Sequence, residues 1–353
     1  MGPPRRVDHV AGGRGHVAGA AYSHRVSNLE QRPQEMSCGG VAVAVRDLSP
    51  ELLEPREVPL GGPRAMLVRR TLPHRDRRMV GAWCFVDHYG PDDVADGPGM
   101  QVPPHPHLGL QTVSWLVEGD VLHRDSIGTT QLVRPGELNL MTAGRAISHS
   151  EESPARRSPR LHGVQLWVAL PDRDRHVEPD FAHHADLPVV SVDGAMVTIV
   201  MGEFGGALSP ARTYTPLLGA DVVLAAGARS QLPLDGGFEH AVLALSDGLV
   251  VDDVPVSRGA MLVLPAGRRD VELISDGPGR VLLLGGEPFE EELLMWWNFV
   301  GRDHEEMIEA RADWEAGRRF GTVRGYDGAP LAAPPLPTTR LHPRPRLRPR
   351  PTD

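Results

Sequence analysis

The sequence contains very little cysteine. Only Cys38 and Cys84 occur among the 353 residues, and neither belongs to a C-x-x-C motif. Two isolated cysteines cannot build the disulfide framework on which small secreted domains depend. We therefore exclude a disulfide-stabilised fold and predict that the protein works in the reducing cytoplasm.

Lysine is absent altogether. Every one of the 37 Lys+Arg residues is an arginine, and the formal net charge of the chain is −9. We attribute the missing lysine to a biased genome composition and draw no functional conclusion from it. A chain with a net negative charge lacks the broad basic surface that nucleic acids require, so we predict no direct nucleic-acid binding.

Long hydrophobic runs are also missing, and no stretch is apolar enough over sufficient length for a signal peptide or a membrane span. We therefore expect no membrane segment. Residues 1–40 are rich in Gly, Arg, His and Ala, and residues 327–353 alternate Pro, Arg and Leu. Such compositions bury too little apolar surface to fold, so we predict a disordered extension at each end.

The remaining length is sufficient for two domains, which we place at residues 41–185 and 186–320. In the second of these, short apolar runs recur with turn residues between them, for example at 196–200, 220–224 and 260–264. This spacing is typical of an all-β barrel or sandwich.

A single helix is predicted after Asp303. Asp303 can cap a helix N-terminus, with Glu306 three residues on, and Gly317 can end it. Met307, Ala310 and Trp314 would share one face, which we expect to pack against a barrel.

The chemistry of the chain is concentrated in residues 105–151. His105 and His107 are two residues apart, as are His149 and Glu151. Side chains alternate along a strand, so each pair should point to one face. Two such strands, paired or facing one another inside a small barrel, would bring three imidazoles and one carboxylate to a single point. This donor set predicts a metal site, and imidazole suits Fe, Zn, Cu and Ni alike.

Alternation also suggests neighbours for this site. Gln111 shares the parity of His105, together with Val113 and Trp115, so we expect Gln111 to face the cavity and orient a ligand by hydrogen bonding. Arg145 shares the parity of Glu151 and is a candidate for orienting its carboxylate. His123 is either a fifth ligand or, as we favour, a hydrogen-bonded support together with Asp125.

The motifs around these residues resemble those of the pirin family. The shared text is H-P-H-L-G at 105–109, P-G-E at 135–137, T-A-G-R-A-I-S-H-S-E at 142–151, H-G-V-Q-L-W-V at 162–168 and M-W-W-N-F-V at 295–300. The resemblance covers about residues 45–320. It implies an all-β fold of two tandem cupin barrels, each a double-stranded β-helix, with a short C-terminal helix. It also implies iron in the first barrel, held at motif positions His105, His107, His149 and Glu151.

The second half of the chain repeats the pattern without the ligands. Ser257-Arg258-Gly259 occupies the place of Pro135-Gly136-Glu137, which indicates duplication. His240 stands alone there, with no H-x-H or H-x-E motif around it. We therefore expect a second barrel that holds no metal.

The resemblance implies two kinds of function. One is an Fe(II)-dependent dioxygenase of the quercetin 2,3-dioxygenase type, acting on a small aromatic, flavonoid-like hydroxyketone. The other is a non-catalytic, iron- and redox-responsive protein that modulates a partner protein or transcriptional regulator. Zn, Mn, Ni or Cu in place of iron stays open at this point, and we expect a monomer.

One departure from the better-known members bears on the choice. Those members read H-P-H-R-G-F-E, whereas this chain has Leu108 and Gln111. Glutamine cannot act as a base, and loss of a general base typically lowers a rate by about 10²- to 10⁴-fold.

Overall fold

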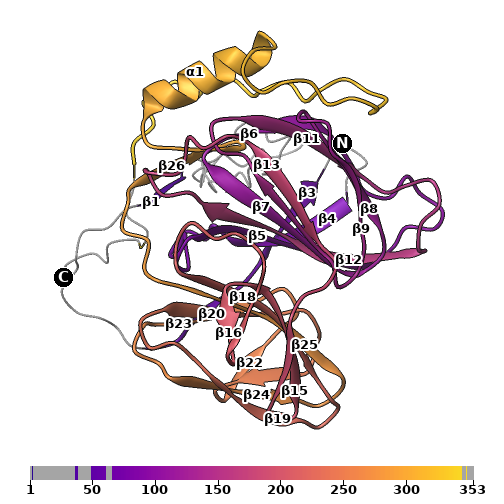
Figure 1. Ribbon diagram of the computed structural model, residues 1–353, viewed down its shortest axis with the longest axis vertical. Coiled ribbons are helices and arrows are strands. Elements are labelled where there is room, and N and C mark those ends of the chain that lie inside the picture. Colours follow the sequence, from indigo (N-terminus) through magenta and orange to yellow (C-terminus); the bar gives the residue numbers. More distant parts are fainter. Residues whose placement is uncertain (1, 3–35, 39–48, 61–65, 344–346, 348–353) are drawn as a thin grey trace.

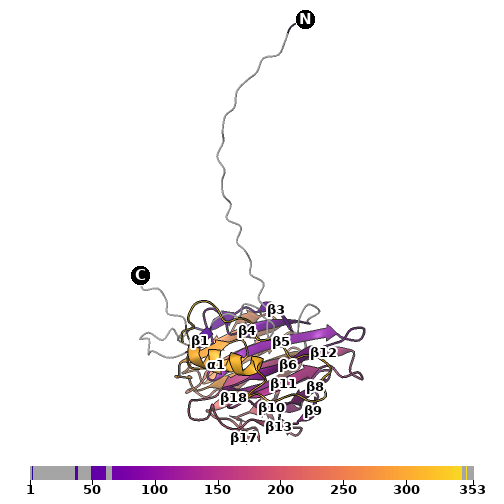
Figure 2. The same ribbon diagram turned by 90° about the horizontal axis from the view of Figure 1, so that it is seen from above.

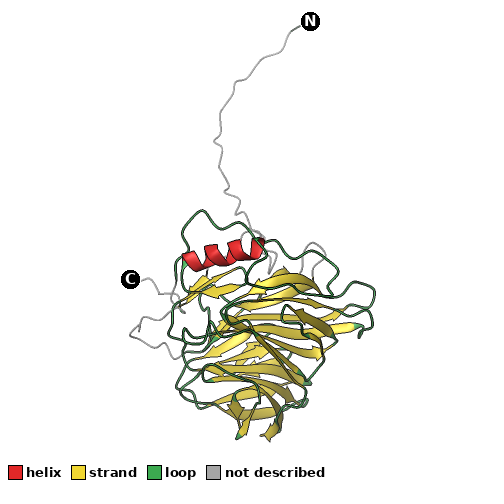
Figure 3. Cartoon of the chain, turned by 45° about the horizontal axis from the view of Figure 1, so that its top comes forward, coloured by secondary structure: helices red, strands yellow, loops and turns green. Residues whose placement is uncertain are grey.

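The structure is a computed structural model that describes residues 2, 36–38, 49–60, 66–343 and 347. The described chain is almost entirely β structure, with α1 (His304–Glu315) as its one helix (Figure 3). The all-β prediction is therefore confirmed. No helix in these ranges is long and apolar enough to cross a membrane.

The chain forms two barrels, one above the other in Figure 1, and each pairs a seven-stranded sheet with a four-stranded one. The large sheet of the first barrel has the order β13 (Asp180–His184), β10 (Leu138–Thr142), β7 (Leu110–Glu118), β12 (Arg160–Ala169), β5 (Trp83–Asp93), β4 (Met66–Leu72) and β3 (Arg56–Leu60). Its small sheet has the order β6 (Gln101–His107), β11 (Ile147–Glu152), β8 (Val121–Asp125) and β9 (Thr130–Val133).

The second barrel repeats this plan. Its large sheet, read from the matching edge, is β2 (Glu51–Leu53), β23 (Met261–Leu264), β20 (Glu239–Ala244), β25 (Gly279–Gly286), β18 (Leu217–Leu224), β15 (Ala195–Met201) and β14 (Val189–Val192). Its small sheet is β19 (Arg229–Pro233), β24 (Asp270–Ser275), β21 (Leu249–Val251) and β22 (Val254–Val256). A short hairpin of β16 (Glu203–Phe204) and β17 (Ala207–Leu208) stands apart from both sheets.

The turn motifs that indicated duplication lie at equivalent places. Gly136 joins β9 to β10 and Gly259 joins β22 to β23, and their φ angles are +79° and +85°. Only glycine adopts such angles readily, which explains why both motifs contain it.

The two large sheets pack against each other. Val113 and Trp115 of the first barrel share one apolar cluster with Leu243 and Leu284 of the second. Trp83 adds polar contacts across this interface, because its indole nitrogen donates to the carbonyls of Leu218 and Gly285, each at 3.1 Å. The barrels therefore form one continuous core, and the row predicted to face the first barrel's cavity lies between the barrels instead.

One strand crosses the expected boundary between the domains. β2 lies within residues 41–185, yet it pairs with β23 at the edge of the second barrel's sheet. The equivalent edge of the first sheet is taken by β13. Of the predicted extension 1–40, only Gly2 and β1 (Met36–Cys38) are described, and β1 pairs with β26 (Leu293–Trp296); the rest of that prediction lies outside the described residues.

The C-terminal part of the chain returns to the first barrel (Figures 1 and 2). β27 (Phe299–Gly301) pairs with β26, and α1 follows with Asp303 as its N-cap. Met307 and Ala310 of the helix are buried in one cluster with Leu108 and Ala146 of the first barrel. The predicted helix and its apolar face are confirmed.

Part of the C-terminal segment is ordered where we expected disorder. Leu331 and Leu341 are 8% and 1% exposed, and Trp314 donates its indole N–H to the carbonyl of Leu331 at 2.7 Å. Composition alone did not reveal this packing, because the apolar surface that covers these leucines belongs to other parts of the chain. Residues 344–346 and 348–353 lie outside the described part.

Candidate metal centre

Two antiparallel strands carry the predicted ligands. β6 pairs with β11 so that His105 stands opposite His149 and His107 opposite Ile147. The register shifts between His149 and Glu151. On its other side β11 pairs with β8, which sets Glu151 opposite His123. The three neighbouring strands thus bring every predicted ligand, and His123, onto one sheet.

The imidazoles converge inside the barrel. The ligand atoms of His105, His107 and His149 all lie within 4.8 Å of one another, and all three residues are buried. A second set with the same spacing contains His123, His149 and Glu151. His149 belongs to both sets, so the structure places the predicted ligands and His123 in two overlapping groups, and the four predicted ligands line one cavity.

Backbone carbonyls orient two of the rings. Nδ1 of His105 lies 2.9 Å from the carbonyl oxygen of Pro103, and Nδ1 of His107 lies 3.0 Å from that of Asn298. A carbonyl only accepts, so Nδ1 carries the proton in each ring and Nε2 keeps its lone pair. A second hydrogen bond of this kind is the usual support of a metal-bound histidine.

His149 is oriented by a longer chain of hydrogen bonds. Nε2 of His123 lies 3.3 Å from a carboxylate oxygen of Asp125, and Nδ1 of His123 lies 3.4 Å from Nδ1 of His149. The carboxylate accepts, so His123 is protonated on Nε2 and accepts from His149. Nε2 of His149 is left with a lone pair, and that buried atom has no hydrogen-bond partner in the protein.

The electrostatics favour the neutral rings that metals bind. Burial lowers the pKa of His105 to about 4. Burial also lowers the pKa values of His107 and His149 well below the usual value, and it raises the pKa of Glu151. A cation bound here would compensate the negative charge of the buried carboxylate and would be coordinated by the unpartnered Nε2 atom of His149. The three imidazoles therefore fit a divalent transition metal, and the Glu151 carboxylate lies on the wall of the same cavity.

The cavity beside these residues is small and partly aromatic. Its free volume is about 20 Å³, and its walls include Phe85, Asp87, Gln165 and Trp167 as well as the ligands. Phe85 and Trp167 stack with their ring centroids 4.0 Å apart. Such a volume holds one water-sized group.

Two polar contacts fix the acidic groups of this wall. Arg70 binds both carboxylate oxygens of Asp87 at 2.7 Å. The hydroxyl of Ser114 lies 3.1 Å from Glu151 and 2.9 Å from the side-chain oxygen of Gln165. Sequence reasoning did not identify Ser114 or Gln165. Ser114 lies on the face of β7 opposite to the one that we predicted to line the cavity, and no prediction was made for the faces of β12, which carries Gln165.

The expectation that Gln111 faces the cavity is wrong. Gln111 donates to the hydroxyl of Thr142 at 3.0 Å and to the carbonyl of Arg212 at 3.2 Å, on the side of the second barrel. The chain turns at Gly109, whose φ is +72°, and passes from the small sheet to the large one. Alternation holds within a strand and is not transmitted through such a turn.

The orienting role expected of Arg145 is also wrong. Arg145 is exposed and pairs with Glu178 at 2.8 Å on the surface. It lies in the turn before β11 next to Gly144, whose φ is +50°. The parity that we counted from Glu151 therefore does not apply to it.

Comparison with known proteins agrees with this architecture. The profile of the Pirin family matches residues 65–168, and that of the Pirin C-terminal cupin domain matches residues 219–321. Among curated proteins, one from Pseudomonas aeruginosa named "Putative quercetin 2,3-dioxygenase" is 46% identical over 80% of this chain and 89% of its own length. A pirin-like protein of Caulobacter vibrioides is 38% identical over 71% of this chain and 88% of its own.

A solved structure shows the same fold. The crystal structure of quercetin 2,3-dioxygenase from Acinetobacter baumannii superposes with a TM-score of 0.79 and 42% sequence identity, covering 82% of this chain and 96% of that one. The predicted tandem arrangement of cupin barrels is confirmed. The chain belongs to the pirin family and is a bicupin with an N-terminal pirin domain and a C-terminal pirin cupin domain.

Proposed function

We propose that this protein is a metal-dependent dioxygenase of the quercetin 2,3-dioxygenase type, acting on a small aromatic hydroxyketone. Ferrous iron is the proposed metal, and the proposed ligands are His105, His107, His149 and Glu151. The observation behind the proposal is the convergence of three buried, neutral imidazoles beside a buried carboxylate. The names of the similar proteins from Pseudomonas and Acinetobacter give independent support.

Bound iron would supply redox chemistry with O₂ that no side chain of this site can perform. The protein's own contribution is to hold three buried rings close together beside a cavity of about 20 Å³. Phe85 and Trp167, which stack on each other, give the cavity an aromatic lining against which a substrate ring can pack. Asp87, fixed by Arg70, offers a carboxylate that can accept a hydrogen bond from a substrate hydroxyl.

The proposal is tested by loading the purified protein with Fe(II) under anaerobic conditions and measuring O₂ uptake with a panel of flavonols and smaller hydroxyketones. We expect uptake that depends on both metal and substrate. The control is His149→Ala, which removes one ligand. Uptake by the wild-type protein that does not exceed this control would refute the enzymatic proposal.

A second candidate is favoured by the size of the cavity. Pockets that enclose drug-sized ligands have volumes of about 300–1,000 Å³, far above the 20 Å³ found here. A flavonol therefore needs side-chain movement to enter, whereas a metal ion does not. The alternative is a non-catalytic, redox-responsive iron protein that modulates a partner protein or transcriptional regulator.

The alternative makes an opposite prediction. Partner capture by the Fe(II) and Fe(III) forms should differ, without any O₂ uptake on addition of hydroxyketones. Equal capture by both forms would remove its basis. Our expectations of a cytoplasmic location and a monomeric state stay predictions under either proposal, as does the choice of iron over Zn, Mn, Ni or Cu.

A further inference from the structure

We propose that Arg302 and Glu306, at the beginning of the C-terminal helix, are positioning residues for the metal ligand His107. In this inference they hold the carbonyl of Asn298 against Nδ1 of His107, which fixes the ring with its Nε2 lone pair toward the metal site. The inference rests on the proposed metal-binding function, and one of its tests below does not require metal.

The first step is that His107 is hydrogen-bonded to a residue far away in the sequence. Asn298 is 191 residues from His107 in sequence, is fully buried, and places its carbonyl oxygen 3.0 Å from Nδ1 of His107. The other two rings are oriented from within the first barrel. His107 alone among the three depends on a segment that follows the second barrel.

The second step is the attachment of that segment. Val300 donates its backbone N–H to the carbonyl of Leu108 at 3.1 Å. Gly109 packs so closely that a Cβ atom there would lie 1.9 Å from the carbonyl oxygen of Val300. The backbone that follows Asn298 is therefore in tight register with the residues that follow His107.

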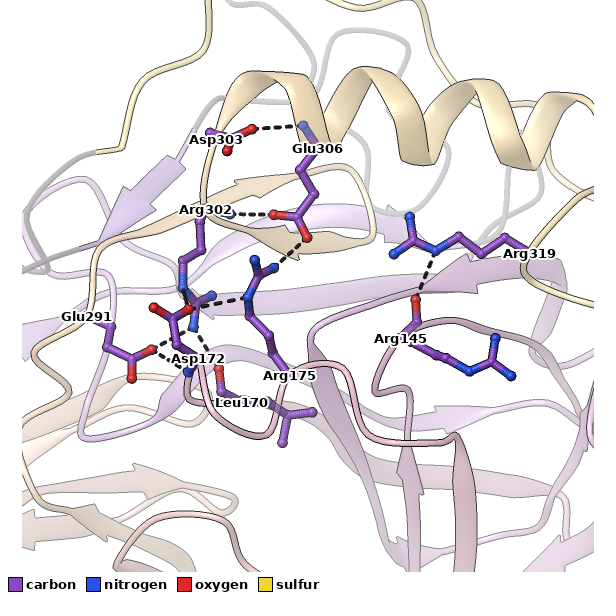
Figure 4. Close-up of polar contacts among 9 residues, drawn as sticks. All are labelled: Arg145, Leu170, Asp172, Arg175, Glu291, Arg302, Asp303, Glu306 and Arg319. Atoms are coloured by element: carbon purple, nitrogen blue, oxygen red, sulfur yellow. Dashed lines mark hydrogen bonds and ion pairs between the residues drawn. The ribbon is translucent and has the colours of Figure 1, made fainter.

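The third step is the network drawn in Figure 4. The side chain of Arg302 donates to the carbonyl of Leu170 at 2.9 Å and to Glu291 at 2.7 Å. Its backbone N–H donates to Glu306 at 2.8 Å, and Glu306 also accepts from Arg175 at 2.5 Å. The side chains of Arg302 and Glu306 are 12% and 13% exposed, whereas that of Glu291 is 35% exposed, so the network is shielded from water mainly around Arg302 and Glu306.

Through Leu170, the network also reaches the residues that follow His107. Leu170, which accepts from Arg302, donates its own N–H to the carbonyl of Gly109 at 3.0 Å. Arg302 thus joins the end of β27 to the loop after β12, and both are bonded to residues 108 and 109. Loosening Arg302 or Glu306 would let β27, and with it the carbonyl of Asn298, move away from His107.

The chemical consequence is a choice of tautomer. Without an acceptor at Nδ1, a neutral imidazole can carry its proton on either nitrogen, and the Nε2–H form cannot bind a metal through Nε2, the atom that this arrangement turns toward the site. Removing the outer partner of a ligand histidine typically lowers metal affinity by about 10- to 100-fold. A network that served only general stability would have no such effect.

The chain offers a matched pair of variants for the test. Glu306→Gln weakens the network, whereas Glu305→Gln alters the neighbouring helix residue, whose carboxylate pairs with Arg340 on the exposed side. Arg302→Gln is the stronger perturbation. Affinity is measured with Co(II) and Zn(II) by chelator competition. The tautomer of His107 is measured by ¹⁵N spectroscopy of the imidazoles in the metal-free protein.

We expect Arg302→Gln and Glu306→Gln to lower Co(II) and Zn(II) affinity by about 10- to 100-fold and to mix the His107 tautomers, with Glu305→Gln unchanged in both. Equal effects of the two glutamate variants, or an unchanged tautomer in folded Glu306→Gln, would overturn the inference. If Arg302→Gln fails to fold, Glu306→Gln decides. If the wild-type protein binds neither metal, the proposed function fails, and the tautomer measurement still decides the present inference.

Discussion

The two barrels have the same strand order, but the side chains that fill them differ in chemical type. In the first barrel, the paired strands β6 and β11 turn histidines and Glu151 inward. In the second, the equivalent strands β19 and β24 turn Leu232, Val271 and Leu273 into a purely apolar cluster. The scaffold tolerates either filling, so the fold by itself does not determine whether a site is present.

A second contrast lies between two buried histidines. His149 and His240 are 1% and 0% exposed. Nδ1 of His149 meets His123, and its Nε2 faces two more imidazoles. Both ring nitrogens of His240 lack a hydrogen-bond partner, and His240 belongs to neither of the candidate metal clusters found among the described residues. Burial of a histidine is thus not a sign of a metal site unless other donors converge on it.

Replacing each of these two histidines by leucine should give the largest difference in metal content between variants. His149→Leu should abolish tight metal binding, because it removes one of three converging imidazoles. His240→Leu should leave the metal content unchanged. Elemental analysis of both purified variants, with circular dichroism to verify folding, checks this prediction. Loss of metal from His240→Leu would contradict our assignment of the site to the first barrel.

The pH dependence of stability sharpens the same contrast. Burial lowers the pKa of His240 to about 4, against 6.5 for an unperturbed histidine. As the pH falls from 6.5 to about 4, the unfolded chain binds a proton at His240 that the folded chain does not bind. Stability is therefore lost across this window, by about 3 kcal/mol from this residue.

His240→Leu should remove that contribution and so reduce the loss of stability of the metal-free protein between pH 6.5 and about 4. Leucine should not destabilise the protein at pH 7, since it also replaces two buried, unpartnered nitrogens. Urea unfolding at several pH values measures both. Burial also lowers the pKa of His88 to about 3 and of His162 to about 4, so some slope should persist in the variant. An unchanged slope would show that His240 is not the titrating group we describe.

A moderate effect is expected from the support of His149. His123→Phe keeps a ring to stack on Phe181, whose centroid lies 4.6 Å away, but removes the acceptor for Nδ1 of His149. Metal affinity should fall by about 10- to 100-fold. His183→Phe is the control, because His183 bonds Asn139 in the large sheet at 2.6 Å. Complete loss of metal in His123→Phe would indicate direct ligation by His123.

The smallest effect is expected at Arg145. Its pair with Glu178 is exposed, and such pairs contribute little. Arg145→Gln should leave metal affinity unchanged within error in a chelator competition. A reduction of tenfold would restore the orienting role that the sequence suggested.

How much of this site was predictable depended on where each residue stood. His105 and His107 lie within one regular strand, so alternation was a sound guide there. His149 and Glu151 also share one strand, but its pairing register with β6 shifts between them. Gln111 and Arg145 lie beyond turns at Gly109 and Gly144, where the count restarts. The Asn298 carbonyl left no sequence signal, because a backbone contact across 191 residues does not constrain side-chain identity.

The fold likewise has parts that local sequence predicted and parts that it did not. Helix α1 was predicted from its cap and its apolar face, which are local features. Composition did not distinguish residues 327–343 from a free tail, because their order depends on distant partners such as Trp314. The placement of β2 in the second sheet was likewise not foreseeable, since a three-residue strand has too little pattern to select its partner.

The position of β2 has a consequence for dissecting the molecule. A fragment cut near residue 185 would leave the second barrel without β2, and the outer hydrogen-bonding groups of β23 would be open to other chains. Open edges of this kind promote strand-to-strand aggregation. The first barrel would in turn lose β27 and α1, which cover Leu108 and Ala146. Each half therefore depends on a strand or helix from the other half of the chain, and we expect neither half to be obtained as a folded, non-aggregating protein by itself.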